Sequence, residues 1–492
     1  MAFPKRFYHM VRKVIEMSIV LDYFKEIAKI PHATYDEKRI SDFLMEFAKR
    51  HQLEAEQDEM YNVIMRKPSN LPGYQGPTVI LQAHMDMVYV SDGTRSYEDG
   101  LLLEEKNGML KAVGTTLGAD NGMAVAYYLA VLASEDFYYP NLEVVFTVQE
   151  EDGLRGAAGL DYSKLKGSCL INMDSEEEQT FCTGCAGGVR THIKLPVQDQ
   201  SVSDFVGYHV SLEGLQGGHS GMAIHLERGN AIQMCGRILQ KIRKYACLSK
   251  IQCKGHANVI SRDASMVLAV RPQDQQKLQK DLQQFEREFQ QELQFSDTIS
   301  IAVKELPSSV STVFSSNTVD ALVGLLTLMP NGVLHNNAAM EGLVETSNNM
   351  GSLEQCGEAL VLTGSIRSSV ASRKQQVVKQ LEELTRLCGG TIEFFGDYPH
   401  WSYRKDSPLR DTAVQVYQKL YGRKPEIFAV HAGLECGYFA QAMPDLDILS
   451  FGPDLHFVHT VKESADLASV ERMWKFLREL LATLANHIET SC

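Results

Sequence analysis

A histidine and an aspartate stand two residues apart at the end of an apolar segment, Leu81-Gln-Ala-His84-Met-Asp86-Met-Val. Side chains two residues apart on an extended chain face the same way. His84 can therefore present one imidazole nitrogen to a cation while Asp86 accepts a hydrogen bond from the other, which fixes the tautomer and makes the ligand more basic. Taken alone, such a pair is more often a strand that ends in two surface polar groups.

Three further acidic sites follow the same pattern. Asp120 lies in Gly-Ala-Asp120-Asn-Gly just before an apolar helix, Glu150-Glu151 follows the apolar run 142–148, and Asp174 follows another such run. Individually, Asp120 also fits a helix N-cap, and the two glutamates also fit a solvated edge. Together they stand at the carboxyl ends of predicted strands, which form the ligand-binding edge of an open parallel sheet.

A second imidazole reaches that edge from the C-terminal part of the chain. His459 lies six residues after Pro453, and this spacing favours it over the competing candidate His456. Two imidazoles and three carboxylates suit a pair of divalent cations such as zinc, each bound by one histidine and one terminal carboxylate. The predicted ligands are His84, Asp120, Glu151, Asp174 and His459, with Asp120 shared by both cations.

Such a pair of cations can activate both a water molecule and a carbonyl group for hydrolysis. Two cations about 3.5 to 4 Å apart polarise a carbonyl and lower the pKa of a bridging water. Glu150 is left free of metal in this set, so it can take a proton from the water and hand it to a departing amine as a general base and acid. The sequence thus predicts a hydrolase in which a metal-bound hydroxide attacks a carbonyl.

The elements that carry these residues alternate between strand and helix. The predicted strands lie at 79–82, 142–148, 169–173 and 446–451, with a last helix near 470–487. This alternation predicts an α/β domain with a mostly parallel sheet, built from both ends of the chain. Near its start, Thr34 and Glu37 have the spacing of a capping box ahead of an amphipathic helix over 40–48.

Between these ends, over roughly residues 188–390, the pattern changes to polar helices with an apolar stripe. Helices are expected at 228–245, 273–294, 318–328 and 372–387, and strands at 208–212 and 361–366. The order of these elements suggests two similar α+β halves, although no residue-level repeat supports a duplication. We therefore expect an inserted α+β domain.

The composition argues against several classes of protein. Lys and Arg total 48 against 62 Asp and Glu, a net charge of −14 without a long basic run, so neither a nucleic acid nor an anionic membrane is expected as a partner. The longest apolar stretch, 123–133, is too short to span a membrane and is predicted to form a buried helix. Ten scattered cysteines fit reduced thiols in the cytoplasm, and Cys182-Thr-Gly-Cys185 lacks the second pair that a zinc site needs, so both are expected to be buried thiols.

In their order along the chain, these motifs resemble those of the zinc-dependent aminoacylase, carboxypeptidase and dipeptidase family with co-catalytic metals. The motifs are His84-Met-Asp86, Gly-Ala-Asp120-Asn-Gly, Glu150-Glu151, Asn172-Met-Asp174-Ser-Glu-Glu and Gly452-Pro453 to His459. Within the family, the chain is most similar to the aminoacyl-histidine dipeptidase branch. The segments that carry this likeness are Gly114-Thr-Thr-Leu-Gly-Ala-Asp120-Asn-Gly, Cys185-Ala-Gly-Gly, Gly217-Gly-His219-Ser-Gly, Pro330-Asn-Gly-Val, Val344-Glu-Thr-Ser and His431-Ala-Gly-Leu-Glu-Cys-Gly437.

The resemblance covers nearly the full chain. It begins at about Met17, which favours a native start there. After His459 the chain reads Thr-Val-Lys-Glu463, where the branch more often shows Ser-Pro-Asp-Glu, so the local turn departs from the pattern.

The resemblance implies a zinc-peptidase catalytic domain over residues 1–187 and 391–492, split by a dimerisation-like lid domain over 188–390. One metal would be held by His84 and Asp174 and the other by Glu151 and His459, with Asp120 between them. His219 in the lid would stabilise the tetrahedral oxyanion, and Asn258 and Arg367 would hold the substrate carboxylate. The resemblance leaves open whether the lid serves its own active site or supplies His219 to a partner in a homodimer.

These expectations lead to a cytoplasmic metallodipeptidase that hydrolyses unblocked dipeptides, with Xaa-His dipeptides as the substrate class. Zinc is the expected pair of metal ions, and the same ligands accept manganese or cobalt. An aminoacylase or carboxypeptidase of the same family is the first alternative. A metal-binding protein without turnover is the second, but a pure binding site has no use for an unligated carboxylate such as Glu150.

Overall fold

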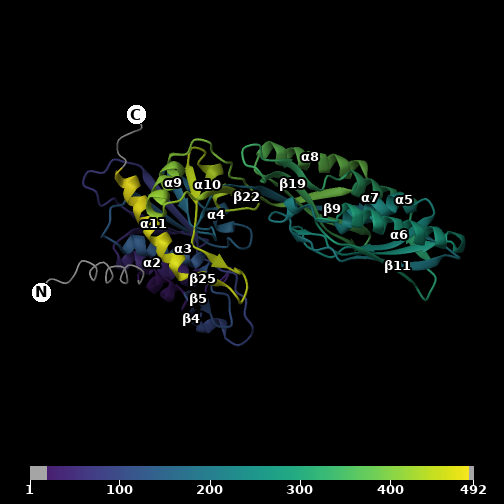
Figure 1. Ribbon diagram of the computed structural model, residues 1–492, viewed down its shortest axis with the longest axis horizontal. Helices are drawn as coiled ribbons and strands as arrows, with labels where there is room; N and C mark the ends of the chain where they lie inside the picture. Colours follow the sequence, from purple (N-terminus) through teal and green to yellow (C-terminus); the bar gives the residue numbers. More distant parts are fainter. Residues whose placement is uncertain (1–18, 487–492) are drawn as a thin grey trace. The chain divides into compact units, whose positions relative to one another are not determined.

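The computed structural model describes residues 19–486 (Figure 1). Contacts divide the chain into two compact units: unit 1 is Met1–Gly184, Tyr403–Ala429 and Leu434–Cys492, and unit 2 is Cys185–Ser402 and Val430–Gly433. The domain limits predicted at 187/188 and 390/391 stay predictions, and the expected start at Met17 lies outside the described residues. Over residues 19–486, no helix has the length and apolar character that crossing a membrane requires.

An eight-stranded sheet forms the centre of unit 1. In spatial order its strands are β1 (Glu54–Gln57), β2 (Val63–Lys67), β6 (Asn141–Thr147), β3 (Thr78–His84), β7 (Cys169–Asn172), β23 (Asp447–Ser450), β8 (Thr180–Cys185) and β22 (Glu426–Val430). The middle strands β6, β3, β7 and β23 are parallel, as predicted, whereas the pairs β1–β2, β2–β6 and β23–β8 are antiparallel. Strands β3 and β6 are buried along almost their whole length, which explains their continuous apolar sequences.

A second sheet of unit 1 has four short strands. In spatial order they are β24 (Leu455–His456), β25 (Ser464–Asp466), β5 (Met109–Ala112) and β4 (Leu103–Lys106). The helices of unit 1 are α2 (Lys38–Arg50), α3 (Ala119–Ala133), α4 (Arg155–Gly159), α9 (Pro408–Tyr421), α10 (Cys436–Ala442) and α11 (Leu467–Asn486).

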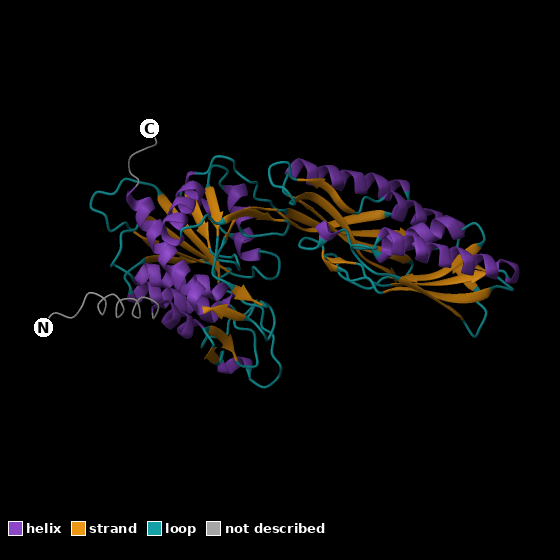
Figure 2. Cartoon of the chain, viewed as in Figure 1, coloured by secondary structure: helices purple, strands orange, loops and turns teal. Residues whose placement is uncertain are grey.

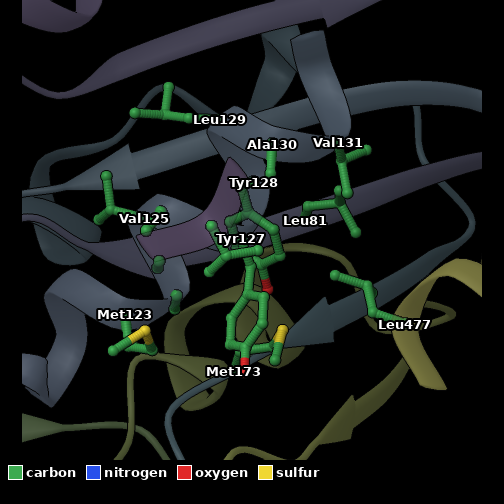
Figure 3. Packing of buried hydrophobic residues seen from close by; sticks show 14 of the residues in the cluster. Leu81, Met123, Val125, Tyr127, Tyr128, Leu129, Ala130, Val131, Met173 and Leu477 are labelled. Carbon is green, nitrogen blue, oxygen red and sulfur yellow. The ribbon is translucent and has the colours of Figure 1, made fainter. Parts of the chain in front are cut away.

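Helix α3 is buried on every side, which confirms the prediction of a buried helix in this stretch. Figure 3 shows Tyr127 and Tyr128 of α3 packed among apolar side chains. The Tyr127 hydroxyl donates to the Val470 carbonyl of α11 at 2.8 Å, and the Tyr128 hydroxyl donates to the Ile171 carbonyl of β7 at 3.0 Å. Both buried hydroxyls therefore have partners, and α3 is fixed against the sheet that carries the predicted site.

Helix α2 forms as predicted, but the predicted capping box does not. Glu37 precedes α2 without a side-chain capping bond, and its Oε1 accepts a hydrogen bond from the Tyr35 N–H at 2.7 Å. Thr34 Oγ1 instead donates to Asp86 Oδ2 at 3.0 Å. A hydrogen bond to a carboxylate is stronger than one to a neutral group, so Thr34 belongs to the predicted site rather than to the helix end.

Unit 2 has four longer helices, α5 (Ala231–Ile242), α6 (Gln275–Glu292), α7 (Ser316–Leu328) and α8 (Ala371–Leu387), at the predicted places. One antiparallel sheet has the spatial order β13 (Ala246–Gln252), β15 (Ala264–Val270), β11 (Val206–Glu213) and β16 (Ser300–Glu305). The other has the order β18 (Gly332–Asn336), β19 (Val344–Cys356), β20 (Ala359–Ser368), β9 (Gly187–Pro196) and β21 (Thr391–Tyr398). Two small sheets pair β10 (Asp199–Ser201) with β17 (Thr312–Phe314) and β12 (Gly218–His219) with β14 (Val259–Ile260).

The two larger sheets of unit 2 have the same topology. Figure 2 shows their strands in orange and the helices in purple. Leaving the short strands aside, β11-α5-β13-β15-α6-β16 and β9-α7-β19-β20-α8-β21 both run strand, helix, strand, strand, helix, strand. Numbered by their order along each run, the four strands of both sheets lie side by side as second, third, first and fourth. Strand β18 is an additional edge strand of the larger sheet. This split β-α-β arrangement confirms two similar α+β halves.

The cysteines of unit 1 and unit 2 agree with the sequence prediction. Cys182 and Cys185 are both buried, as predicted, and the described chain has free thiols at Cys169, Cys235, Cys247, Cys253, Cys356 and Cys388.

Candidate active site

Three strands of unit 1 deliver predicted site residues to one edge of the sheet. Strand β3 ends at His84, Glu150 and Glu151 follow β6, and Asp174 follows β7. Because β6, β3 and β7 are parallel neighbours, their carboxyl ends lie at the same edge. Asp120 enters this edge from the first turn of α3.

Asp120 lies between the two predicted histidine ligands. Its Oδ1 is 3.3 Å from His84 Nε2, and its Oδ2 is 3.2 Å from His459 Nε2. Asp174 Oδ1 lies 3.6 Å from His84 Nε2, and Glu151 Oε1 lies 2.8 Å from His459 Nε2. The Asp120 carboxylate thus turns one oxygen toward each histidine, as a bridging ligand must.

These atoms form groups that could each hold a cation. Within residues 19–486, three groups have ligand atoms that all lie within 4.8 Å of one another: His84, Asp120 and Asp174; Asp120, Glu151 and His459; and His84, Glu150 and Glu151. The first two groups share Asp120, and each offers one imidazole and two carboxylates, a donor set suited to zinc. All five predicted ligands therefore come together, whereas His456 is exposed and belongs to none of the groups.

The electrostatics of this cluster favour added positive charge. Hydrogen bonds to Asp120 and Glu151 raise the pKa of His459 to about 11. Burial alone would lower the pKa of His84, but hydrogen bonds to Asp120 and Asp174 raise that pKa well above its usual value. Burial raises the pKa of Asp174 to about 6. The carboxylates outnumber the imidazoles in a buried space, so a bound cation would replace the protons that they attract.

Glu150 belongs to neither of the two groups that contain Asp120. Burial raises the pKa of Glu150 well above its usual value, and the charges of Asp174 and Glu151 add to the shift. A raised pKa makes the Glu150 carboxylate a stronger base than an exposed glutamate, which suits a group that must accept a proton from water. Gln149, just before it, has a φ of 52°, a left-handed conformation that turns the chain sharply after β6.

Asp86 contacts both His84 and the two glutamates. His84 Nδ1 lies 3.1 Å from the Asp86 backbone carbonyl oxygen and 3.5 Å from carboxylate Oδ1. The carboxylate accepts hydrogen bonds from the N–H groups of Glu150 at 3.0 Å and Glu151 at 3.4 Å. Asp86 therefore orients His84 chiefly through its carbonyl group and fixes the turn of the two glutamates through its carboxylate.

Asn121 supports a predicted ligand but was not itself a predicted site residue. Its Nδ2 donates to Asp174 Oδ1 at 2.8 Å and to the Met173 carbonyl at 2.9 Å. These bonds hold the Asp174 carboxylate toward His84. The sequence signal was its place beside Asp120 in the glycine-flanked motif.

Glu463 is a second supporting residue that the sequence did not identify. Its buried carboxylate accepts hydrogen bonds from the backbone N–H groups of Leu117 (2.7 Å), Gly118 (3.0 Å) and Ala119 (2.8 Å). Together these bonds fix the turn that leads into Asp120. The signal was an acid four residues after His459, the one position of Thr-Val-Lys-Glu463 that agrees with the branch pattern.

We expect the Glu463→Gln variant to loosen the turn before Asp120. The amide nitrogen cannot accept a hydrogen bond, so at least one buried N–H loses its partner, which costs about 1–3 kcal/mol. The free energy of unfolding should fall by about this amount, and the amides of residues 117–119 should exchange hydrogen faster. Glu104→Gln, an exposed change on β4, is the control. Unchanged exchange at 117–119 in Glu463→Gln contradicts the account.

His219 and Arg367 meet in unit 2. His219 Nε2 lies 3.4 Å from Arg367 Nη2, Arg367 Nη1 donates to Tyr398 Oη at 2.7 Å, and Arg367 Nε lies 3.4 Å from Ser220 Oγ. We call these four residues the arginine cluster. Asn258 adjoins it through its backbone oxygen, which accepts a hydrogen bond from the Ser220 N–H at 2.8 Å.

His219 is a neutral donor in the arginine cluster. Burial, and then the charge of Arg367, lower the pKa of His219 to about 4. The Met222 N–H donates to His219 Nδ1 at 3.1 Å, which assigns the ring proton to Nε2. Because guanidinium nitrogens only donate, the 3.4 Å contact of Nε2 with Arg367 Nη2 is then not a hydrogen bond. Nε2 can therefore donate a hydrogen bond to an oxygen of a ligand.

Arg367 has no acidic partner among residues 19–486. It is only 7% exposed, and its side-chain contacts are with the neutral groups of His219, Ser220 and Tyr398. A buried charge without a counter-charge is costly, so an anion that reaches the guanidinium is stabilised there. A carboxylate fits best, because guanidinium binds it through two parallel N–H bonds.

Comparisons with known proteins relate the chain to peptidases. The pattern of peptidase family M20/M25/M40 matches residues 80–483. The cytosol non-specific dipeptidase of Escherichia coli (strain K12) is 34% identical over 473 residues, which are 94% of this chain and 96% of that protein. The structure of aminoacylhistidine dipeptidase from Vibrio alginolyticus is 32% identical, covers 96% of this chain and 99% of its own, and has a TM-score of 0.89. A tripeptidase from Staphylococcus aureus, 15% identical over 96% of this chain and 99% of its own with a TM-score of 0.56, shows the fold alone.

Proposed function

Since this chain belongs to peptidase family M20/M25/M40, which makes it a hydrolase of peptide bonds, we propose that it is a metal-dependent dipeptidase with Xaa-His dipeptides as its substrate class. The observation that carries the proposal is the Asp120 carboxylate between His84 and His459, with one oxygen toward each. Two relatives that match nearly the full chain, from E. coli and V. alginolyticus, bear the names of dipeptidases.

Two divalent cations, zinc first, would occupy the site in unit 1. His84 and Asp174 would hold one cation, Glu151 and His459 the other, and Asp120 both. Such cations would polarise the carbonyl of the peptide bond and lower the pKa of a bound water. The mixture of imidazoles and carboxylates supports zinc, and manganese or cobalt would fit the same ligands.

Glu150 would move the proton during hydrolysis. Its carboxylate takes a proton from the attacking water and then gives it to the nitrogen of the leaving amino acid, so the products are one free carboxylate and one free amine. The raised pKa that burial gives Glu150 supports this role. Asp86, which accepts a hydrogen bond from the Glu150 N–H, would keep the base in place.

The arginine cluster of unit 2 would recognise the C-terminal part of the substrate. Arg367, assisted by Asn258, would bind the carboxylate of the dipeptide, and its lack of an acidic partner in the described chain supports this role. His219 would donate from Nε2 to the oxyanion that forms on the scissile carbonyl.

We expect Arg367→Gln to weaken the binding of substrates with a free carboxylate. Hydrogen bonds to charged groups contribute about 1.5–3 kcal/mol each, so the KM for alanyl-histidine should rise about 10- to 150-fold. The KM for alanyl-histidine amide, which lacks the carboxylate, should not change. Arg287→Gln, an exposed change on α6, is the control. An equal rise in KM for both substrates contradicts carboxylate recognition by Arg367.

A panel of blocked and unblocked substrates tests the proposed function. Alanyl-histidine and β-alanyl-histidine should be cleaved by the metal-loaded protein, and N-acetyl-histidine should not. Cleavage of N-acetyl-histidine without cleavage of the free dipeptides would instead indicate an aminoacylase. Release of single C-terminal residues from longer peptides would indicate a carboxypeptidase.

We also propose that the protein acts in the cytoplasm. The name of the E. coli relative, a cytosol dipeptidase, supports this location, and so do the free cysteines of the described chain. Fractionation of native cells with an antibody to the chain tests it, and enrichment with membranes or in the medium contradicts it.

Residues 188–390 would act as a lid on a catalytic domain formed by 1–187 and 391–492. A mixture of His219→Ala and Glu150→Ala chains tests whether one chain uses its own His219. Restored activity indicates a homodimer that shares His219, and absence of activity indicates a self-contained chain.

A further inference from the structure

A buried glutamate that the proposed mechanism does not use lies behind the metal site of unit 1. Glu435 immediately precedes α10 and is 1% exposed. Its Oε2 accepts hydrogen bonds from Gln82 Nε2 at 2.5 Å and from Thr147 Oγ1 at 2.6 Å. Gln82 Oε1 in turn accepts a hydrogen bond from Asn172 Nδ2 at 2.7 Å. One carboxyl group is therefore linked to side chains on three neighbouring strands.

Each of these three side chains closely precedes a residue of the proposed active site. The pairs are Gln82 and His84 on β3, Thr147 and Glu150 at the end of β6, and Asn172 and Asp174 at the end of β7. The strands are in register here, since Gln82 pairs with Asn172 and His84 pairs with Thr147. A shift of any of these strand ends would move a metal ligand or the proposed base.

The charges around Glu435 are unusual for a buried acid. Within residues 19–486, no lysine or arginine forms an ion pair with it, and the charges of His84, Asp174 and Asp86 act on it. Burial raises the pKa of Glu435 to about 7. Oε1 has no hydrogen-bond partner among the described residues. The carboxyl group thus holds the strands through one oxygen, Oε2.

We propose that Glu435 is a positioning residue for the metal site. Through Gln82 and Thr147 it fixes the ends of β3 and β6, and through Gln82 and Asn172 it fixes the end of β7. It acts only through the residues that bind cations and move the proton. The inference rests on the proposed metal centre.

Zinc binding to the metal-free protein, measured by competition with a chromophoric chelator, tests this proposal. We expect Glu435→Ala to lower the zinc affinity about 10- to 100-fold, the range for residues that orient metal ligands. The visible absorption spectrum of the cobalt-loaded variant should change as well, because the ligand geometry changes. Glu435→Gln keeps an acceptor at the Oε2 position and should bind zinc nearly as the wild type does.

Glu143→Ala is the matched control. Glu143 is a buried glutamate on the same strand as Thr147, and its Oε2 accepts hydrogen bonds from the N–H groups of Lys166 (2.9 Å) and Gly167 (3.0 Å). Its loss should lower the stability of the protein without lowering the zinc affinity. If Glu435→Ala does not fold, Thr147→Val, which removes one of the hydrogen bonds with little change in shape, replaces it.

Wild-type zinc affinity in folded Glu435→Ala, or in Thr147→Val where that variant replaces it, overturns the inference. A drop in affinity that Glu143→Ala shares equally also overturns it, because any damage to the sheet would then be enough. A wild-type protein that binds no zinc overturns the proposed metal centre instead, so the two failures are distinguishable.

Discussion

The Asp120→Asn variant is expected to lose both cations at once. Asp120 places one oxygen 3.3 Å from His84 Nε2 and the other 3.2 Å from His459 Nε2. Asparagine offers one neutral oxygen, and its NH₂ group cannot bind a cation. Residues that only support metal ligands already contribute about 10- to 100-fold to affinity, so the loss of a shared ligand should exceed about 100-fold. Zinc content per chain and hydrolysis of alanyl-histidine should fall together.

The control for Asp120→Asn is Asp445→Asn, an exposed change of the same type in unit 1. Both variants should be folded, as judged by circular dichroism, and the control should keep its zinc. Two zinc ions per chain in Asp120→Asn would show that Asp120 does not bridge the cations.

The Glu150→Gln variant is expected to lose turnover while it keeps its metal. General acid–base catalysis contributes about 10²- to 10⁴-fold. The kcat for alanyl-histidine should therefore fall by at least about 10²-fold, with little change in zinc content. Glutamine has nearly the same shape but cannot take up the proton. Stopped assays with long incubation measure the residual rate.

Glu151→Gln provides a matched comparison one residue away. Glu151 lies 2.8 Å from His459 Nε2, so its replacement should lower the zinc affinity, unlike the replacement of Glu150. A kcat within tenfold of wild type for Glu150→Gln would remove Glu150 from the role of general base. Equal loss of zinc in both variants would assign Glu150 to the ligands.

The site residues at the carboxyl edge of the sheet could be predicted because each lies close in sequence to the apolar strand that positions it. Strands β6 and β7 are short apolar runs buried by neighbouring elements, and their acids follow within a few residues. The alternation of strands and helices predicted parallel pairing, but not the spatial order β6-β3-β7-β23. The plan of unit 2 could be read from element order, but the pairing of β9 with β20 joins segments about 170 residues apart and needed the structure.

The supporting contacts could not be predicted because their partners are distant in the sequence. Glu463 binds the Leu117 N–H across 346 positions, and Glu435 binds Thr147 across 288 positions. Thr34 shows the converse case, in which a local capping pattern is present but a tertiary contact with Asp86 takes its place. For Arg367, the resemblance indicated a role. The physical reason for that role is its burial without an acidic partner among residues 19–486, which only the structure shows.

Metal-dependent hydrolysis is tested most directly by the release of free histidine from alanyl-histidine, with protein that has been stripped of metal and then reloaded. We expect no release after chelation, recovery with zinc or manganese, and no recovery in reloaded Glu150→Gln. Histidine release that survives complete chelation would contradict it. So would a wild-type protein that binds two cations and cleaves no unblocked dipeptide.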